Sequence, residues 1–274
     1  MNRRRVWAVA RNDLRQLAYS PDFWAPMLVL AALFFVIIPT FLLFFMTHLG
    51  GVGTVQKVSA ALDVLPQAAQ HAIRGTTQND RTAYALAVYL FAPMAVIVPM
   101  TISTAVGANT VVGEREKGTG EFLAHSPASE REIYLGKLIA SLLPGYLTTL
   151  VGFGLYSLMV NLVVGPHVGG WFFPTPAWWV LMLWVVPPFL AITLSVVLRL
   201  SARVKSAAAA QQASGLVTLP LIVLSYAQST GSLLGAGHAG LLVGAFAWIF
   251  AVFGLMRGAR AVTRARLLGV DGAT

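Results

Sequence analysis

The chain has 274 residues, of which 57% are hydrophobic and 11% are charged, and its formal net charge is +9. Several apolar runs of about 20 residues, the length of a membrane-spanning helix, exclude an ordinary soluble protein and predict an all-α integral membrane protein. The basic residues flank these runs, as topology signals do, so the positive charge does not indicate a nucleic-acid partner. Because the chain has no cysteine, disulfides and thiolate metal sites are excluded as well.

Residues 1–22 predict a helix that lies in the membrane interface before the chain enters the bilayer. Apolar residues recur there at helical spacing with arginines on another face: Trp7, Ala10, Leu14 and Leu17 against Arg4, Arg11 and Arg15. A basic tail that only sets orientation is the alternative. Ser20-Pro21-Asp22 then interrupts the helical pattern, because a proline starts a helix more readily than it continues one.

Six apolar runs predict six spans, which make residues 1–274 a single transmembrane domain. The spans are expected at residues 23–46, 83–106, 138–164, 178–200, 208–227 and 239–256. The fifth run is the weakest because Gln211 and Gln212 stand at its start, but the alternation of sides requires it. Between the first two spans, residues 47–82 have no assigned role, and short amphipathic helices are expected within 58–73.

The basic residues indicate how the spans are oriented. Five precede the first span, four lie in residues 113–137, three close the fourth span and four follow the sixth, which places 16 of the 19 on one side. By the positive-inside rule this side is the cytoplasm, so both termini are expected there, in a multi-pass protein of the cell membrane. The outer loops hold four scattered histidines, which we interpret as solvated residues and not as a metal site: His48, His71, His167 and His238.

The charged segment, residues 113–137, lies between the second and third spans. It holds five acidic and four basic residues, so it must lie in water and not in hydrocarbon. Thr119 is expected to cap a short helix over 121–125 that ends at Ser126-Pro127. Ser129 and Glu132 fit the capping box S-x-x-E, which predicts the start of the helix that forms the third span. A solvated loop with no further role is the alternative.

Motifs for catalysis and for ion-driven transport are missing. The sequence has no G-x-x-x-x-G-K-[ST] phosphate loop and no H-E-x-x-H zinc motif, so we expect neither an enzyme nor a bound cofactor or metal. The predicted spans also lack Asp, Glu, Lys and His, from which proton- and sodium-driven carriers commonly build their ion pathways. Movement driven from outside the bilayer, through the charged segment, is the remaining interpretation.

Two stretches of the chain resemble a known family. The run G-E-R-E-K-G-T-x-E-F-L, followed by S-P-A-S-E-R-E-I-Y-L-G-K-L, resembles the loop between the second and third spans of type-2 ABC exporter permeases. The N-terminal R-N-D-L-R-Q-L-A-Y-S-P-D is similar to the helix that precedes the first span in that family. The resemblance covers the six-span plan, and its specific residues lie mainly in the charged segment.

The resemblance implies a cytoplasmic coupling helix that docks on a separate ATP-binding cassette subunit. The residues that would dock are Glu114, Arg115, Glu116, Lys117, Gly118, Thr119, Glu121, Phe122 and Leu123. Those that would shape the return into the third span are Ser126, Pro127, Arg131, Gly136 and Lys137. Gly120 departs from the family, which usually has a larger apolar residue there. The implied assembly has two ATP-binding subunits, which hold ATP and Mg²⁺, and a second permease chain, identical or related.

The resemblance also implies export of a substrate, and the uncharged spans favour a hydrophobic or amphiphilic one, such as a drug, a lipid or a lipid-linked molecule. Hydroxyl side chains that are candidates to line its route are Tyr89, Thr101, Thr104, Tyr146, Thr149 and Tyr156. Ordinary helix packing is the alternative role for each of them. The alternative function is a membrane scaffold or sensor that recruits a cytoplasmic partner through residues 113–137, and co-purification of an ATPase distinguishes the two.

Overall fold

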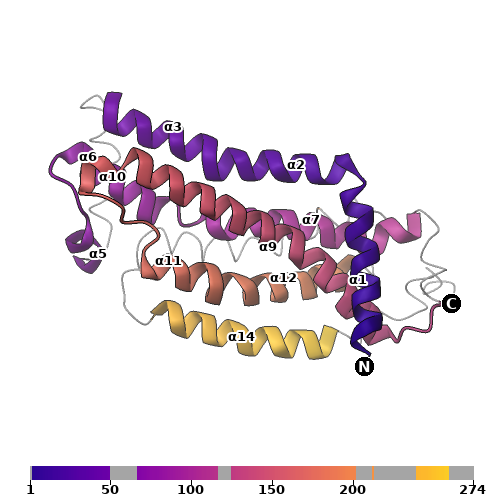
Figure 1. Ribbon diagram of the computed structural model, residues 1–274. Coiled ribbons are helices and arrows are strands. Elements are labelled where there is room, and N and C mark those ends of the chain that lie inside the picture. The colour runs from indigo at the N-terminus through magenta and orange to yellow at the C-terminus, as the bar shows by residue number, and fades with distance from the viewer. Residues whose placement is uncertain (1, 50–66, 117–124, 202–211, 213–238, 259–274) are drawn as a thin grey trace.

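The computed structural model describes residues 2–49, 67–116, 125–201, 212 and 239–258, and all secondary structure in these ranges is helical (Figure 1). Five helical stretches are long and apolar enough to cross a membrane: Trp24–His48, Gln78–Thr110, Glu130–Val163, Pro176–Ser201 and Gly240–Arg257. They coincide with the predicted first, second, third, fourth and sixth spans. The predicted fifth span, residues 208–227, falls almost wholly outside the described residues, so the count of six stays a prediction.

The N-terminal helix α1 (Arg3–Ala18) crosses one end of the bundle at a steep angle to the long helices (Figure 1). It begins at Asn2, whose side chain accepts a hydrogen bond from the backbone N–H of Arg4 at 3.0 Å. It ends before Ser20, and Pro21 opens the next helix, as the sequence predicts. The position of α1 in the membrane interface stays a prediction.

Several spans are built from consecutive helical pieces. The first consists of α2 (Pro21–Ala32), η1 (Leu33–Ile37), α3 (Ile38–Phe44) and η2 (Phe45–Leu49). The second consists of α6 (Gln78–Ala85), η3 (Leu86–Leu90) and α7 (Met94–Glu116), and the third is the single helix α9 (Glu130–Val163).

The fourth span consists of α11 (Pro176–Val180), η4 (Leu181–Val185) and α12 (Val186–Ser201), and the last is α14 (Ala239–Gly258). Two short helices, α5 (Gln67–Ala72) and α10 (Gly165–Val168), lie outside the spans.

Three of the π-helical pieces stand just before a proline. η1, η3 and η4 end two or three residues before Pro39, Pro93 and Pro187. A proline lacks the N–H that would bond the carbonyl four residues earlier, and its ring clashes with that carbonyl. A locally wider helical turn relieves this conflict, as is common in membrane helices.

After η3 the second span is interrupted, and two side chains from other helices satisfy the carbonyls at the break. Tyr156 donates its hydroxyl hydrogen to the Ala87 carbonyl at 2.6 Å, and Trp178 donates its indole N–H to the Val88 carbonyl at 2.9 Å. Both side chains are at most 1% exposed. Because hydrocarbon offers no substitute partner, these two hydrogen bonds tie the second span to the third and fourth.

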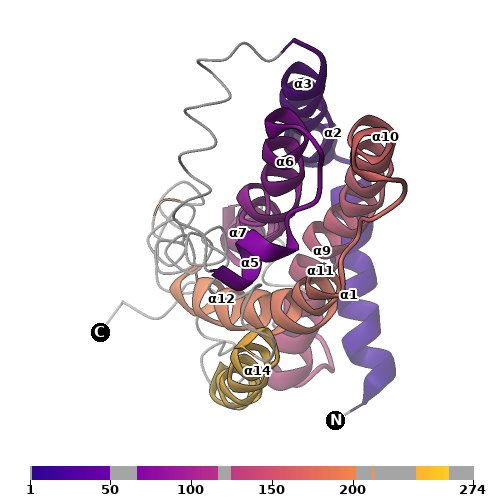
Figure 2. The same ribbon diagram turned by 90° about the vertical axis from the view of Figure 1, so that its left-hand side faces the viewer.

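Helix α9 lies between α7 and α1, and α12 packs between α7 and α14 (Figure 2). The α7–α9 contact is close at Gly145, where a Cβ atom would lie 2.9 Å from the Pro99 carbonyl oxygen. At Gly107, where α7 meets α12, a Cβ atom would lie 2.9 Å from a methyl group of Leu194. Small residues let membrane helices approach closely, so these glycines bring the backbones of three spans together.

Candidate functional site

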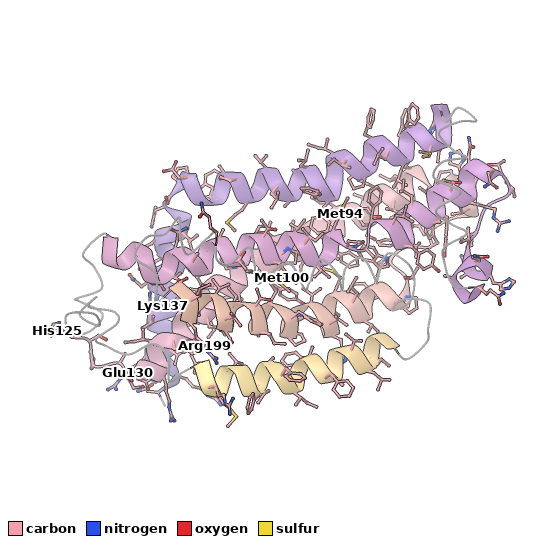
Figure 3. All side chains as sticks on the ribbon, turned by 180° about the vertical axis from the view of Figure 1, so that it is seen from behind. Met94, Met100, His125, Glu130, Lys137 and Arg199 are labelled. Carbon is pink, nitrogen blue, oxygen red and sulfur yellow. The ribbon has the colours of Figure 1, made fainter. Side chains whose placement is uncertain are left out.

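The charged segment joins two helices that emerge from the bundle at the same end (Figure 3). α7 continues to Glu116, ten residues beyond the predicted end of the second span, which extends it by roughly 15 Å. Glu114, Arg115 and Glu116 are therefore helical in their backbone. The other predicted docking residues, from Lys117 to Leu123, lie outside the described residues. The coupling helix itself stays a prediction.

The start of α9 forms the predicted capping box. The Ser129 hydroxyl accepts the backbone N–H of Glu132 at 3.4 Å, and the Glu132 carboxylate accepts the backbone N–H of Ser129 at 2.9 Å. The two groups satisfy backbone donors that a helix start leaves without an intrahelical partner. The helix that forms the third span thus begins at a fixed residue within the charged segment.

The N-terminus of α1 is attached to this helix start. The second carboxylate oxygen of Glu132 accepts the backbone N–H of Asn2 at 2.5 Å. Arg5 donates to the Pro127 carbonyl at 2.8 Å, and its guanidinium lies 4.0 Å from the Glu132 carboxylate. Glu132 therefore joins two segments that lie 130 residues apart in the sequence.

One turn further along α9, a buried lysine joins three helices. The Lys137 ammonium donates to the Thr110 carbonyl of α7 at 2.6 Å and lies 3.5 Å from the Asp13 carboxylate of α1. The side chains of Lys137 and Asp13 are 0% and 7% exposed. Burial raises the pKa of Asp13 above its usual value of 3.8, while the charge of Lys137 and its hydrogen bond act in the opposite direction.

Gly136 lets α1 approach α9 closely enough for these contacts. A Cβ atom there would lie 2.7 Å from the Cβ atom of Val9 and 3.0 Å from the Val6 carbonyl oxygen. We refer to Asn2, Arg5, Asp13, Thr110, Glu132, Gly136 and Lys137 together as the helix junction. It fixes α1, the end of α7 and the start of α9 to one another, and its members Glu132, Gly136 and Lys137 belong to the charged segment.

The sequence placed Lys137 at the return into the third span but not its partner. The available signal was that Asp13 falls on the same helical face as Val6 and Ala10, three residues after Ala10. Val6, Ala10 and Asp13 are the three buried residues of α1. An acid on an otherwise apolar buried face requires a partner, but one helix cannot show which distant cation supplies it.

The hydroxyl residues predicted to line a route are mostly buried and hydrogen bonded within the protein. Tyr146 donates to the Met182 carbonyl at 2.9 Å and Tyr156 to the Ala87 carbonyl. Three threonines donate to carbonyls of their own helices, at 2.7–2.8 Å: Thr101, Thr104 and Thr149. Tyr89 is buried and Thr101 is exposed. These contacts fit helix packing, and a role of the six residues in a route stays a prediction.

On the other end of the bundle, two of the outer histidines lie together and are not scattered as the sequence suggested. The His48 and His167 rings are 5.6 Å apart, and His167 Nδ1 lies 3.4 Å from the Asp80 carboxylate. Asp80 is itself the acidic member of the capping box that begins α6. Within the described ranges, no group of three or more potential ligands is arranged to hold a metal ion.

Comparison with known proteins identifies the family. The sequence model of a family described as "ABC-2 family transporter protein" matches residues 7–241, from within α1 to the beginning of α14. No curated protein sequence matches the chain. The family match takes in the charged segment, all of the helix junction except Asn2 and Arg5, and all of the predicted spans except most of the last. A multi-pass bundle of apolar helices matched over this length belongs to the ABC-2 family of transporter membrane proteins.

Proposed function

We propose that this chain is the membrane-spanning permease of an ATP-driven exporter, energised by a separate ATP-binding cassette subunit that docks on the charged segment. The observation that carries the proposal is the family match over residues 7–241. It is supported by the arrangement of α7 and α9, which lead from the bilayer into the two ends of the charged segment. The chain has no phosphate-binding loop of its own, so ATP and Mg²⁺ belong to the partner.

Force applied to the charged segment would reach three helices. α7 and α9 receive it directly, because the segment connects them. α1 receives it through Lys137, Asp13 and Glu132, which link it to α9. Two ATP-binding subunits that close on ATP would tilt the second and third spans and open a path at the interface with a second permease chain, identical or related. A buried ion pair transmits such movement because separating its charges is costly.

The substrate class follows from the spans. Their described residues contain no acidic, lysine or histidine side chain within the predicted limits, so they offer no charged group for a free ion. A hydrophobic or amphiphilic substrate therefore fits these spans better than a free ion does. The distribution of basic residues predicts that the charged segment and both termini lie in the cytoplasm, so the proposed direction of transport is outward.

Purification of the tagged permease from its own cells tests the partner. We expect an ATP-binding cassette subunit to co-purify, and the ATPase activity of the complex to respond to transported amphiphiles. A permease that transports in vesicles with no ATPase present would contradict the proposal.

Charge reversal tests the docking site. Glu114→Lys and Glu121→Lys should each abolish transport and uncouple ATP hydrolysis without reducing the amount of protein in the membrane. Asp271→Lys makes the same change of charge near the C-terminus, outside the charged segment, and should leave transport unchanged. Normal export by both charged-segment variants would exclude a coupling role.

A further inference from the structure

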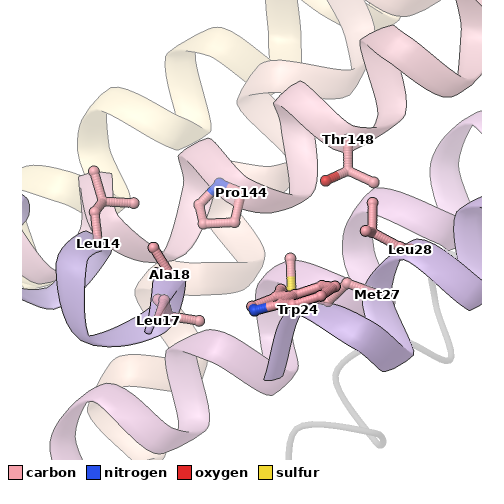
Figure 4. Close-up of a pocket in the computed structure, with 8 residues that line it drawn as sticks. All are labelled: Leu14, Leu17, Ala18, Trp24, Met27, Leu28, Pro144 and Thr148. Atoms are coloured by element: carbon pink, nitrogen blue, oxygen red, sulfur yellow. The ribbon is translucent and has the colours of Figure 1, made fainter. Parts of the chain in front are cut away.

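An apolar groove runs along α9 where α1 turns into α2. It consists of two adjoining cavities of about 430 and 410 Å³ that share Leu28 and Thr148 in their linings. Figure 4 shows the first cavity, which residues of α1, α2 and α9 line, with Trp24 and Leu28 facing Pro144 and Thr148. We refer to the two cavities together as the α1–α2–α9 groove.

The lining suits a hydrocarbon chain. Of the residues that line one cavity or the other, only Trp24 and Thr148 carry a side-chain group that forms hydrogen bonds. From Pro144 to Leu155 the groove follows α9 for roughly 16 Å, which is about the depth of one bilayer leaflet. The leaflet concerned is the one beside α1 and the helix junction.

The end of the groove at α1 is positively charged. Arg11 and Arg15 are exposed and stand three residues before the lining residues Leu14 and Ala18, so each is a neighbour of the groove on the helix surface. Among the described residues neither arginine forms an ion pair. The single acid of α1, Asp13, is buried against Lys137, and in α2 only Asp22 is acidic. The exposed surface of α1 therefore attracts anions.

We propose that the α1–α2–α9 groove binds a phospholipid with an anionic headgroup, with one acyl chain in the groove and the phosphate at Arg11 and Arg15. An apolar slot one leaflet deep, with two cations at its interfacial end that have no ion-pair partner among the described residues, has this shape and this charge. A juxtamembrane basic residue contributes about 1 kcal/mol to the binding of anionic lipid, which corresponds to about fivefold in affinity. The site is separate from the charged segment, and its occupation does not depend on transport.

Quenching of tryptophan fluorescence by brominated lipids tests the proposal, because Trp24 lines the groove and is 43% exposed. The purified permease is reconstituted in bilayers that contain acyl-brominated phosphatidylglycerol or phosphatidylcholine. The Trp24 contribution is the difference between the wild type and Trp24→Phe. We expect phosphatidylglycerol to be preferred at Trp24 by about fivefold or more.

Matched variants locate the headgroup and the chain. Arg11→Gln with Arg15→Gln should abolish the preference, whereas Arg3→Gln with Arg4→Gln, the same loss of charge at the start of α1, should retain it. Thr148→Phe fills the groove and should remove the Trp24 quenching, whereas Leu158→Phe, at a 43% exposed position of α9 outside the groove, should not.

Three results would overturn the proposal. Equal quenching by the two lipids would show ordinary contact with bulk lipid. Quenching by neither would show that protein covers the groove, either another part of this chain or a second copy. An equal loss of preference in both double-arginine variants would show a general effect of charge. None of these readouts requires an ATPase, so they are independent of the test of the proposed function.

Discussion

The ammonium group of Lys137 lies 3.5 Å from the carboxylate of Asp13, and both side chains are buried although they lie on different helices, 124 residues apart. The same ammonium donates to the Thr110 carbonyl. This contact makes α1 part of the bundle instead of an independent surface helix. Lys137 is the last residue of the charged segment, so any movement of α9 there is shared by α1.

Removing the lysine should destabilise the protein strongly. Lys137→Met leaves the Asp13 carboxylate buried without its cation, and breaking a buried pair from one side costs about 3–5 kcal/mol. We expect this loss in the free energy of unfolding, measured by titration of the detergent-solubilised protein with SDS. The double variant Lys137→Met with Asp13→Leu removes both charges and should recover most of the loss. If the double variant is less stable than the single one, loss of the ion pair does not explain the lower stability of Lys137→Met.

The single variant Lys137→Met should also show an altered dependence of stability on pH. Burial raises the pKa of Asp13 above 3.8, and Lys137 opposes this shift. Without the lysine, the pKa of Asp13 in the folded protein rises further. The protonated carboxyl then contributes stability that is fully present at pH values below 3.8 and is lost as the pH rises through the folded-state pKa of Asp13. The melting temperature of Lys137→Met should therefore lie further below that of the wild type at pH 8 than at pH 5. A constant difference would show that Asp13 does not titrate in this range.

The sequence predicted features that depend on local pattern. Hydropathy located the five described spans, and S-x-x-E located the capping box at Ser129 and Glu132. Contacts between distant helices were not predictable, because hydropathy shows which residues enter the membrane but not which faces meet. The pairing of Asp13 with Lys137 and the proximity of His48 to His167 are of this kind. The hydroxyl of Tyr156 was singled out, but its bond to the Ala87 carbonyl depends on a break in another helix.

Enlarging Gly136 should separate α1 from α9. In Gly136→Ala the new methyl group would lie 2.7 Å from the Cβ atom of Val9, and Val6 contributes a backbone oxygen that cannot rotate away. Overpacking of this kind costs about 1–3 kcal/mol. We expect a lower melting temperature and faster proteolysis within α1. Gly154→Ala is the control, because a Cβ atom there would meet nothing within 4 Å apart from its chain neighbours and the nearby backbone of its own helix, and it should be neutral or stabilising. Equal effects of the two substitutions would show that the α1 contact is not responsible.

Tyr156→Phe should destabilise the bundle although it removes a single oxygen atom. The hydroxyl is the donor to the Ala87 carbonyl at 2.6 Å, next to the break in the second span, and the aromatic ring packs against Phe173 and Trp178. The phenylalanine keeps the ring contacts but leaves a buried carbonyl without its donor, which costs about 1–3 kcal/mol. SDS titration should show this loss. Tyr19→Phe removes a hydroxyl from a side chain that is 86% exposed and should leave stability unchanged. If Tyr156→Phe is as stable as the wild type, then backbone groups of the second span satisfy the Ala87 carbonyl without Tyr156 of the third span.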